Sequence, residues 1–129
     1  MKKVIQAVTI CLFVSMFSAC SKPEVSKGDQ LFNKGDFTEA IDVYTDKLKY
    51  SPNDVRVLYN RGRAYEENGE FKLAKSDFDQ ALELDPNNFQ VLLTLANLHH
   101  KEKNFTNALL YSNRAADIPG APAMASFMK

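Results

Sequence analysis

The strongest constraint in this sequence is a repeat of 34 residues. When the chain is shifted by 34 positions, small residues, aromatic residues and alanines coincide in three successive copies. The coinciding sets are Gly28, Gly62 and Ala96; Phe37, Phe71 and Phe105; and Ala40, Ala74 and Ala108. The outer copies match less well, which is usual for terminal repeats. A unit of this length cannot bury its apolar side alone, so the pattern predicts hairpins that stack on one another.

Prolines mark the end of each repeating unit. Pro86 has no amide hydrogen and disfavours a helix at the residue before it, so it should end one helix and let Asn87 or Asn88 cap the next. Pro52 should act in the same way, and the repeat continues this position to Gly120. The apolar periodicity between these points predicts helices and no strands. The expected helices are Pro23–Asn33, Phe37–Lys49, Asp54–Asn68, Phe71–Leu84, Asn88–Lys103 and Phe105–Asp117.

The order of small, aromatic, alanine and proline positions at this period resembles the tetratricopeptide repeat (TPR), over about Ser21 to Gly120. The resemblance implies an all-α solenoid, a right-handed superhelix of three helix-turn-helix hairpins with an incomplete fourth repeat at the C-terminus. The expected boundaries are 23–120 for the three repeats, at about 21–54, 55–88 and 89–122, and 121–129 for the start of a fourth repeat or a truncated cap.

Small and large residues in the repeat predict how each hairpin packs. Gly62 and Ala74 are small because two helices should cross there, and a larger side chain would force them apart. Tyr65, Phe71 and Phe78 are then expected to fill the space beside them. We interpret these aromatic residues as core and not as a base-stacking or cofactor-binding surface.

The first residues have the order of a secretory signal. Lys2 and Lys3 precede an uncharged run, Val4–Phe17, and a polar segment follows. The run has 14 residues, whereas a helix needs roughly 20 to cross a bilayer, so a permanent membrane span is not expected. We predict a signal peptide at 1–19.

The sequence "FSAC" at the end of this run resembles the lipobox of bacterial lipoproteins, although leucine is usual where Phe17 stands. The resemblance implies that Cys20 is lipidated and becomes the mature N-terminus, with 20–22 as a short tether to a membrane. Ser21 follows the cysteine, and in the family this favours the outer membrane, facing the periplasm. The alternative is an ordinary signal peptide with a chance cysteine, which would give a secreted or periplasmic soluble protein. Cys11 and Cys20 are the only cysteines, so the body holds no disulfide.

The TPR resemblance also implies that the first helix of each hairpin lines a concave groove. In the middle repeat, one face of this helix carries Arg56, Tyr59, Arg63 and Glu66. Such a mixed face suits a partner peptide or helix, with aromatic and apolar anchors and arginines that pair with acidic groups. The alternative is that this face is only solvated and binds no ligand. The candidate groove residues are Phe32, Arg56, Tyr59, Asn60, Arg63, Leu93 and Asn97.

Some TPR proteins clamp a C-terminal carboxylate with Lys and Asn side chains from successive hairpins. In this sequence Asn60 matches that pattern, but Val25, Asp29, Gln90 and Thr94 occupy the other positions. Binding of chaperone tails is therefore not implied.

Composition and motifs exclude several other classes. The 16 basic and 16 acidic side chains balance, so nothing indicates a nucleic-acid partner. His99 and His100 point about 100° apart on a helix and cannot share a metal ion, so we expect His99 to pack at the core or its edge. The sequence holds no phosphate-binding loop, nucleophile elbow or zinc-binding HExxH motif. We therefore expect no enzyme activity, no metal and no cofactor.

The leading hypothesis is a membrane-anchored TPR adaptor of the bacterial cell envelope that binds a partner protein or peptide through its groove. One alternative is a constitutive structural subunit that packs through the solenoid end and leaves the groove idle. A remote alternative is a small envelope enzyme. The segment Pro122–Lys129 starts like another first helix and carries Met124, Phe127 and Met128. An apolar solenoid end predicts possible self-association.

Overall fold

Six helices and no strands make up residues 26–121, the part of the chain that the computed structural model describes. They are α1 (Lys27–Lys34), α2 (Phe37–Tyr50), α3 (Val55–Glu67), α4 (Phe71–Leu84), α5 (Phe89–Lys101) and α6 (Phe105–Ala116). The prediction of an all-α chain of helical hairpins is confirmed. The predictions for 1–19, the tether at 20–22, Cys20 and Pro122–Lys129 lie outside the described residues.

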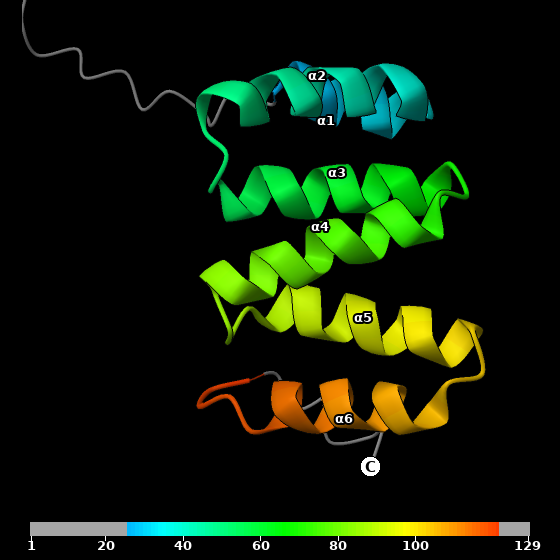
Figure 1. Cartoon of the computed structure of the whole chain (residues 1–129), viewed down its shortest axis with the longest axis vertical. Coiled ribbons are helices and arrows are strands. Elements are labelled where there is room, and N and C mark those ends of the chain that lie inside the picture. The colour runs from blue at the N-terminus through cyan, green and yellow to red at the C-terminus, as the bar shows by residue number, and fades with distance from the viewer. Residues whose placement is uncertain (1–25, 122–129) are drawn as a thin grey trace, which may run out of the picture.

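The helices pair in chain order into three hairpins, and the hairpins stack one after another along the long axis of the molecule (Figure 1). Within a hairpin, α1 packs on α2, α3 on α4, and α5 on α6. Between hairpins, α2 contacts α3 and α4 contacts α5. None of the described helices combines the length and apolar character needed to span a bilayer.

Glycines allow the two helices of a hairpin to cross closely. A Cβ atom at Gly62 would lie 2.6 Å from Cε1 of Phe78, whose side chain is fully buried. Gly28 lies in the same way against Tyr44, since a Cβ atom at Gly28 would lie 2.5 Å from Cε1 of that ring. These distances confirm that the small residues of the repeat mark crossing points.

The turns between hairpins follow the predicted proline pattern. The amide of Asp54 donates to the carbonyl of Ser51, and the amide of Asn88 donates to that of Asp85. Asn88, one of the two candidates, caps α5, because its side chain accepts a hydrogen bond of 3.1 Å from the amide of Val91.

Three details differ from the sequence predictions. The first helix begins at Lys27 and not at Pro23, because the hydroxyl of Ser26 caps it by accepting from the amide of Asp29. Phe71 is 45% exposed and is not core, since it starts α4 at the edge of the hairpin turn. After α6 the chain makes a turn at residues 118–121, and Pro119, not Gly120, is its second residue. The turn comes early because α6 has 12 residues, whereas α2 and α4 have 14. The other helix ends agree with the prediction within two residues.

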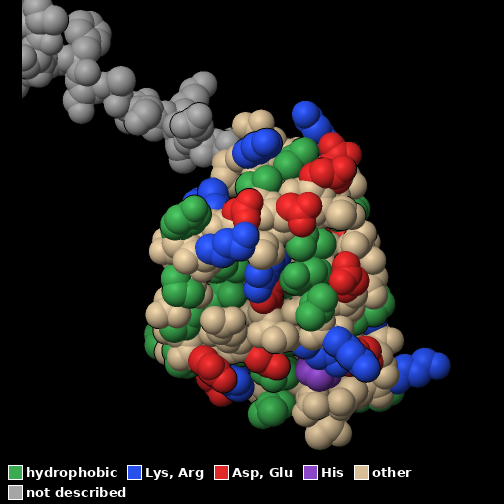
Figure 2. Space-filling view, turned by 45° about the horizontal axis from the view of Figure 1, so that its top comes forward, with side chains coloured by type: hydrophobic (Ala, Val, Ile, Leu, Met, Phe, Trp, Pro, Cys, Tyr) green, Lys and Arg blue, Asp and Glu red, His purple; other side chains and the backbone are tan. Residues whose placement is uncertain are grey.

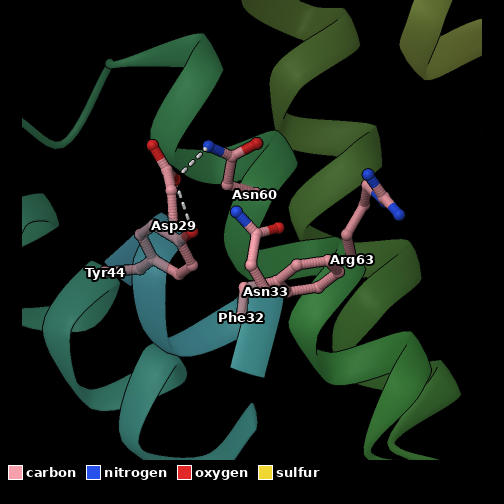
Figure 3. Close-up of a pocket in the computed structure, with 6 residues that line it drawn as sticks. All are labelled: Asp29, Phe32, Asn33, Tyr44, Asn60 and Arg63. Atoms are coloured by element: carbon pink, nitrogen blue, oxygen red, sulfur yellow. Dashed lines mark hydrogen bonds between the residues drawn. The ribbon is translucent and has the colours of Figure 1, made fainter. Parts of the chain in front are cut away.

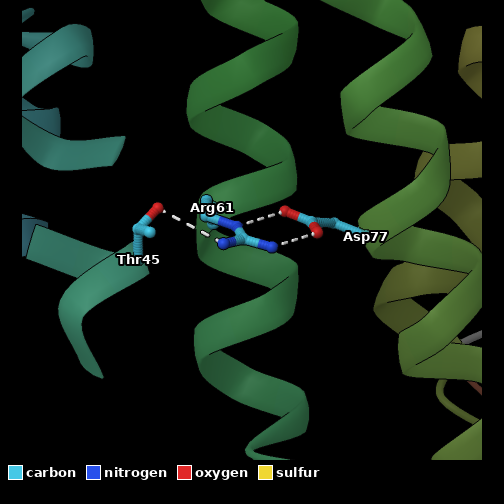
Figure 4. A network of polar contacts seen from close by, with 3 residues as sticks. All are labelled: Thr45, Arg61 and Asp77. Atoms are coloured by element: carbon cyan, nitrogen blue, oxygen red, sulfur yellow. Dashed lines mark hydrogen bonds and ion pairs between the residues drawn. The ribbon is translucent and has the colours of Figure 1, made fainter. Parts of the chain in front are cut away.

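One buried polar cluster joins the first two hairpins. Arg61 of α3 donates to both carboxylate oxygens of Asp77 in α4, at 2.8 and 2.7 Å, and to the hydroxyl of Thr45 in α2 at 3.3 Å (Figure 4). The side chains of Arg61 and Asp77 are only 18% and 6% exposed. A buried charge needs such complete pairing, so this cluster fixes α3 between its two neighbours.

Candidate functional site

The first helices α1, α3 and α5 carry two hollows, which together we call the groove. The first hollow, of about 170 Å³, lies where α1, α2 and α3 meet (Figure 3). Its lining residues are Asp29, Phe32, Asn33, Tyr44, Asn60 and Arg63.

Asp29 organises the first hollow. One of its carboxylate oxygens accepts a hydrogen bond of 2.6 Å from the hydroxyl of Tyr44 and one of 3.0 Å from the side-chain amide of Asn60 (Figure 3). Burial alone would raise the pKa of Asp29, but the hydrogen bonds from Tyr44 and Ser26 and the charge of Arg56 together lower it below its ordinary value. Burial and the nearby Asp29 carboxylate raise the pKa of the Tyr44 hydroxyl. The hollow therefore holds a fixed negative charge at neutral pH.

Arg63 borders the first hollow on its other side. Its guanidinium lies over the ring of Phe32, 4.9 Å from the centroid, and Phe32 in turn packs edge-on against Phe37 at 5.3 Å. No ion pair of Arg63 occurs within residues 26–121. A cation stacked on an aromatic ring keeps its N–H groups free for a ligand.

The second hollow, of about 410 Å³, lies between α3 and α5. Tyr59 spans it, with its hydroxyl 3.4 Å from that of Thr94 and its ring 5.9 Å from the ring of Phe78. Its lining residues are Tyr59, Arg63, Glu66, Glu67, Thr94, Asn97, His100 and Lys101. Lys101 donates to Glu66 at 2.8 Å, so one pair of charges in this hollow is already satisfied.

Five of the seven predicted groove residues come together around these hollows. They are Phe32, Asn60 and Arg63 at the first hollow, and Tyr59, Arg63 and Asn97 at the second. Arg63 belongs to both hollows and links them. Leu93 is half-buried against the core, Arg56 is exposed, and neither lines a hollow.

The predicted groove residues do not include several residues that line the hollows: Asn33, Tyr44, Glu67, Thr94, His100 and Lys101. Tyr44 comes from a second helix, but its place opposite Gly28 brings its hydroxyl to Asp29 of α1. Asp29 stands at one of the clamp positions in the sequence, but no sequence pattern predicts its hydrogen bond to Asn60. The one clamp-like asparagine is therefore already bonded to a carboxylate of this chain.

His99 packs as predicted. It is 8% exposed and stacks on Tyr111, with ring centroids 5.4 Å apart and planes 6° from parallel. Its Nδ1 atom lies 3.6 Å from the carboxylate of Glu102. Within residues 26–121, no three His, Cys, Asp or Glu side chains are grouped so that they could hold a metal ion.

Charges on the surface are mixed. Figure 2 shows basic and acidic side chains interspersed over one face of the molecule, without a broad area of one sign. The mixed charges on this face agree with the balanced composition.

Comparison with known protein families identifies the repeat. Three family models match, described as TPR repeat over residues 28–69 and as tetratricopeptide repeat over 55–88 and 78–116. Residues 28–116 contain tetratricopeptide repeats. The TPR hairpins of the sequence prediction are thus confirmed.

Curated relatives match the TPR hairpins over a small part of their own length. The heat shock protein sti1 homolog of Schizosaccharomyces pombe is 43% identical over 61 residues, which cover 47% of this chain and 10% of the relative. Human sperm-associated antigen 1 is 30% identical over 88 residues, 68% of this chain and 10% of the relative. The chain spans about a tenth of the length of these relatives.

Solved TPR structures are similar over most of the chain. The TPR2B domain of yeast Sti1, solved as a complex with pHsp70, is 28% identical with a TM-score of 0.69, covering 78% of this chain and 83% of that one. MamA is 27% identical with a TM-score of 0.69, covering 78% and 58%. The Sgt2 TPR domain from Aspergillus fumigatus, 23% identical with a TM-score of 0.70 over 83% and 75%, shows the shared fold.

Proposed function

We propose that this chain is a protein-interaction adaptor whose TPR groove binds a partner peptide or protein subunit. Its TPR relatives, which include a domain solved with pHsp70, support a protein-interaction role. The observation that carries the proposal here is Arg63, which lies stacked on Phe32 between the two hollows and has no ion pair within the described residues.

The groove favours an acidic or polar side chain within a peptide over a free terminal carboxylate. Arg63 offers an unpaired guanidinium, and Tyr59 offers an apolar ring beside it. The first hollow, by contrast, holds the charged carboxylate of Asp29, whose hydrogen bonds use the amide of Asn60. A second carboxylate there would meet like charge and a donor that is already engaged.

The role is a binding one and needs no catalytic group. Two carboxylates that line the groove are engaged in structural contacts: Asp29 with Tyr44 and Asn60, and Glu66 with Lys101. A general base or nucleophile would need a free side chain poised beside a substrate cavity. We therefore propose an adaptor and not an enzyme.

The proposed location is the bacterial cell envelope, with the chain anchored in a membrane through an acylated Cys20. The support is the "FSAC" sequence at the end of an apolar run that is too short to span a bilayer. One acyl chain anchors a protein only marginally, whereas several chains on one cysteine hold it stably. Ser21 after the cysteine favours the outer membrane, with the groove facing the periplasm.

Site-specific photocrosslinking tests the groove. A photoreactive phenylalanine analogue replaces Tyr59, and a matched control carries it at Ser76, an exposed position on α4 outside both hollows. We expect a discrete adduct from position 59 in intact cells and none from position 76. Equal adducts from both positions, or none from position 59, would show that the groove does not hold the partner.

A further inference from the structure

The last hairpin carries a hollow that has counterparts in the two hairpins before it. This hollow, of about 320 Å³, lies along α5 and α6 and includes Asn97, His100, Phe105 and Leu109 among its lining residues. We call it the terminal face. Nothing within residues 26–121 packs against it from a following hairpin.

In the earlier hairpins the corresponding positions bind the next first helix. Asp29 stands one repeat before Arg63 and two before Asn97, and it accepts a hydrogen bond from Asn60 of α3. Glu66 stands one repeat before His100 and accepts a hydrogen bond of 2.8 Å from α5. The terminal face is therefore the third copy of a surface that twice receives a helix.

The exposure of apolar side chains also differs between the first and the last hairpin. Ile41 of α2, a helix that α3 contacts, is 9% exposed, whereas Leu109, two repeats later in α6, is 49% exposed. Phe105 beside it is 60% exposed. Burial of exposed apolar side chains is favourable, so the face favours an apolar occupant.

The chain leaves α6 through the type of turn that precedes α3 and α5. In each of the turns 51–54, 85–88 and 118–121, the amide of the fourth residue donates to the carbonyl of the first at 3.0 to 3.2 Å. Each of these turns has proline in its second position. The first two turns lead directly into a first helix, and the third has the same hydrogen bond and the same proline position.

We propose that Pro122–Lys129 forms the beginning of a fourth first helix and docks on the terminal face. Proline suits the first position of a helix, because its missing amide hydrogen is not needed there. Counted from the turn, Met124 and Met128 take the places of Val91 and Leu95, both fully buried in α5. These methionines would then face α6, and the groove continues onto a fourth helix. The proposal does not depend on what the groove binds.

Cysteine crosslinking tests this docking. Cys11 and Cys20, the only cysteines, are replaced by serine in the full chain. Asn97→Cys is then combined with Phe127→Cys or with Met128→Cys. Phe127 corresponds to Thr94 of α5 when positions are counted from the preceding turn, and Met128 corresponds to Thr94 by the 34-residue repeat. The positive control is Arg63→Cys with Thr94→Cys, the same positions one repeat earlier, which both line the second hollow. The negative control is Lys72→Cys with Met128→Cys, since Lys72 lies on the exposed side of α4.

After mild oxidation we expect one of the two Asn97 pairs to form an intramolecular disulfide, with a yield within about twofold of the positive control. Yields no higher than that of the negative control would overturn the proposal. A disulfide-linked dimer from the Asn97 pairs would also overturn it, and would show that a second copy occupies the face.

Deletion of residues 122–129 gives a second readout that needs no new side chains in the face. We expect the shortened chain to bind an apolar dye several-fold more strongly than the full chain. Circular dichroism should show that the shortened chain is still folded and helical. Equal dye binding by the two chains would contradict the docking, because the segment would then cover nothing.

Discussion

Arg61 and Asp77 face each other across the middle hairpin and share two hydrogen bonds, of 2.8 and 2.7 Å, in the geometry of a planar fork on a carboxylate. Arg61 also donates to Thr45 in the preceding hairpin. One side chain thus ties together three helices, α2, α3 and α4. The rigidity of α3 matters because this helix carries Tyr59 and Arg63 on its groove side.

The first prediction concerns this pair. Asp77→Ala should lower the free energy of unfolding by about 2 to 3 kcal/mol, because it leaves Arg61 largely buried without its partner. Urea unfolding followed by circular dichroism measures the change. Asp46→Ala is the control, since it removes the pair with Lys49, in which both side chains are about two-thirds exposed, and should leave the free energy of unfolding nearly unchanged. Equal effects of the two substitutions would refute a structural role for the Arg61 cluster.

A second prediction follows from the crossing of α3 and α4. Gly62→Ala should destabilise the protein by about 1 to 3 kcal/mol, because the new methyl group would overlap the buried ring of Phe78. Thermal unfolding measures it, and the same substitution should cost less in a Phe78→Leu background, where the smaller side chain leaves room for the methyl group. Ser76→Ala, on an exposed part of α4, is the control. If Gly62→Ala is as stable as the parent, the close crossing is wrong.

Most of the fold could be predicted because its determinants are periodic. Gly62, Phe78 and Pro86 recur at fixed spacing, and each has a local physical effect that a single sequence reveals. The errors arose where a non-repeating detail decided the outcome. Ser26 caps α1 with its own hydroxyl, and α6 stops two residues short of its counterparts, so that Pro119 replaces the expected Gly120 in the turn.

The candidate site was predictable in position but not in its contacts. Helical periodicity places Tyr59, Asn60 and Arg63 on one side of α3, and this was sufficient to find the groove. The hydrogen bond from Asn60 to Asp29 and the stacking of Arg63 on Phe32 join different hairpins. Such contacts depend on the angle between hairpins, which no spacing in the sequence encodes.

The lowered pKa of Asp29 predicts a pH dependence. Because the folded carboxyl has a pKa below its ordinary value of 3.8, its contribution to stability is complete above about pH 5 and is lost as the pH falls through the folded pKa. The stability difference between the parent and Asp29→Asn should therefore be larger at pH 6 than at pH 3. Urea unfolding at both values tests this, with Asp42→Asn on the exposed side of α2 as control. A difference that does not change with pH would contradict the prediction.

A further prediction concerns the N-terminus. If Cys20 is acylated, mass spectrometry of the mature protein should find a lipid-modified cysteine as the first residue, and Cys20→Ser should move the protein from the membrane to the soluble fraction. Cys11→Ser is the matched control and should change neither result. An unmodified mature N-terminus, or membrane retention that survives Cys20→Ser, would rule out the anchor.

The most direct test of the central claim is the affinity of the crosslinked partner for groove variants. Tyr59→Ala with Arg63→Ala removes the aromatic and cationic contacts of the groove, and Arg63→Glu reverses one exposed charge without touching the core. Lys72→Ala with Ser76→Ala alters the outer side of α4 and serves as the control. Titration calorimetry should show at least a tenfold weaker Kd for both groove variants and an unchanged Kd for the control. Groove variants that bind within twofold of the parent, while folded by circular dichroism, would contradict the proposal that the groove binds the partner.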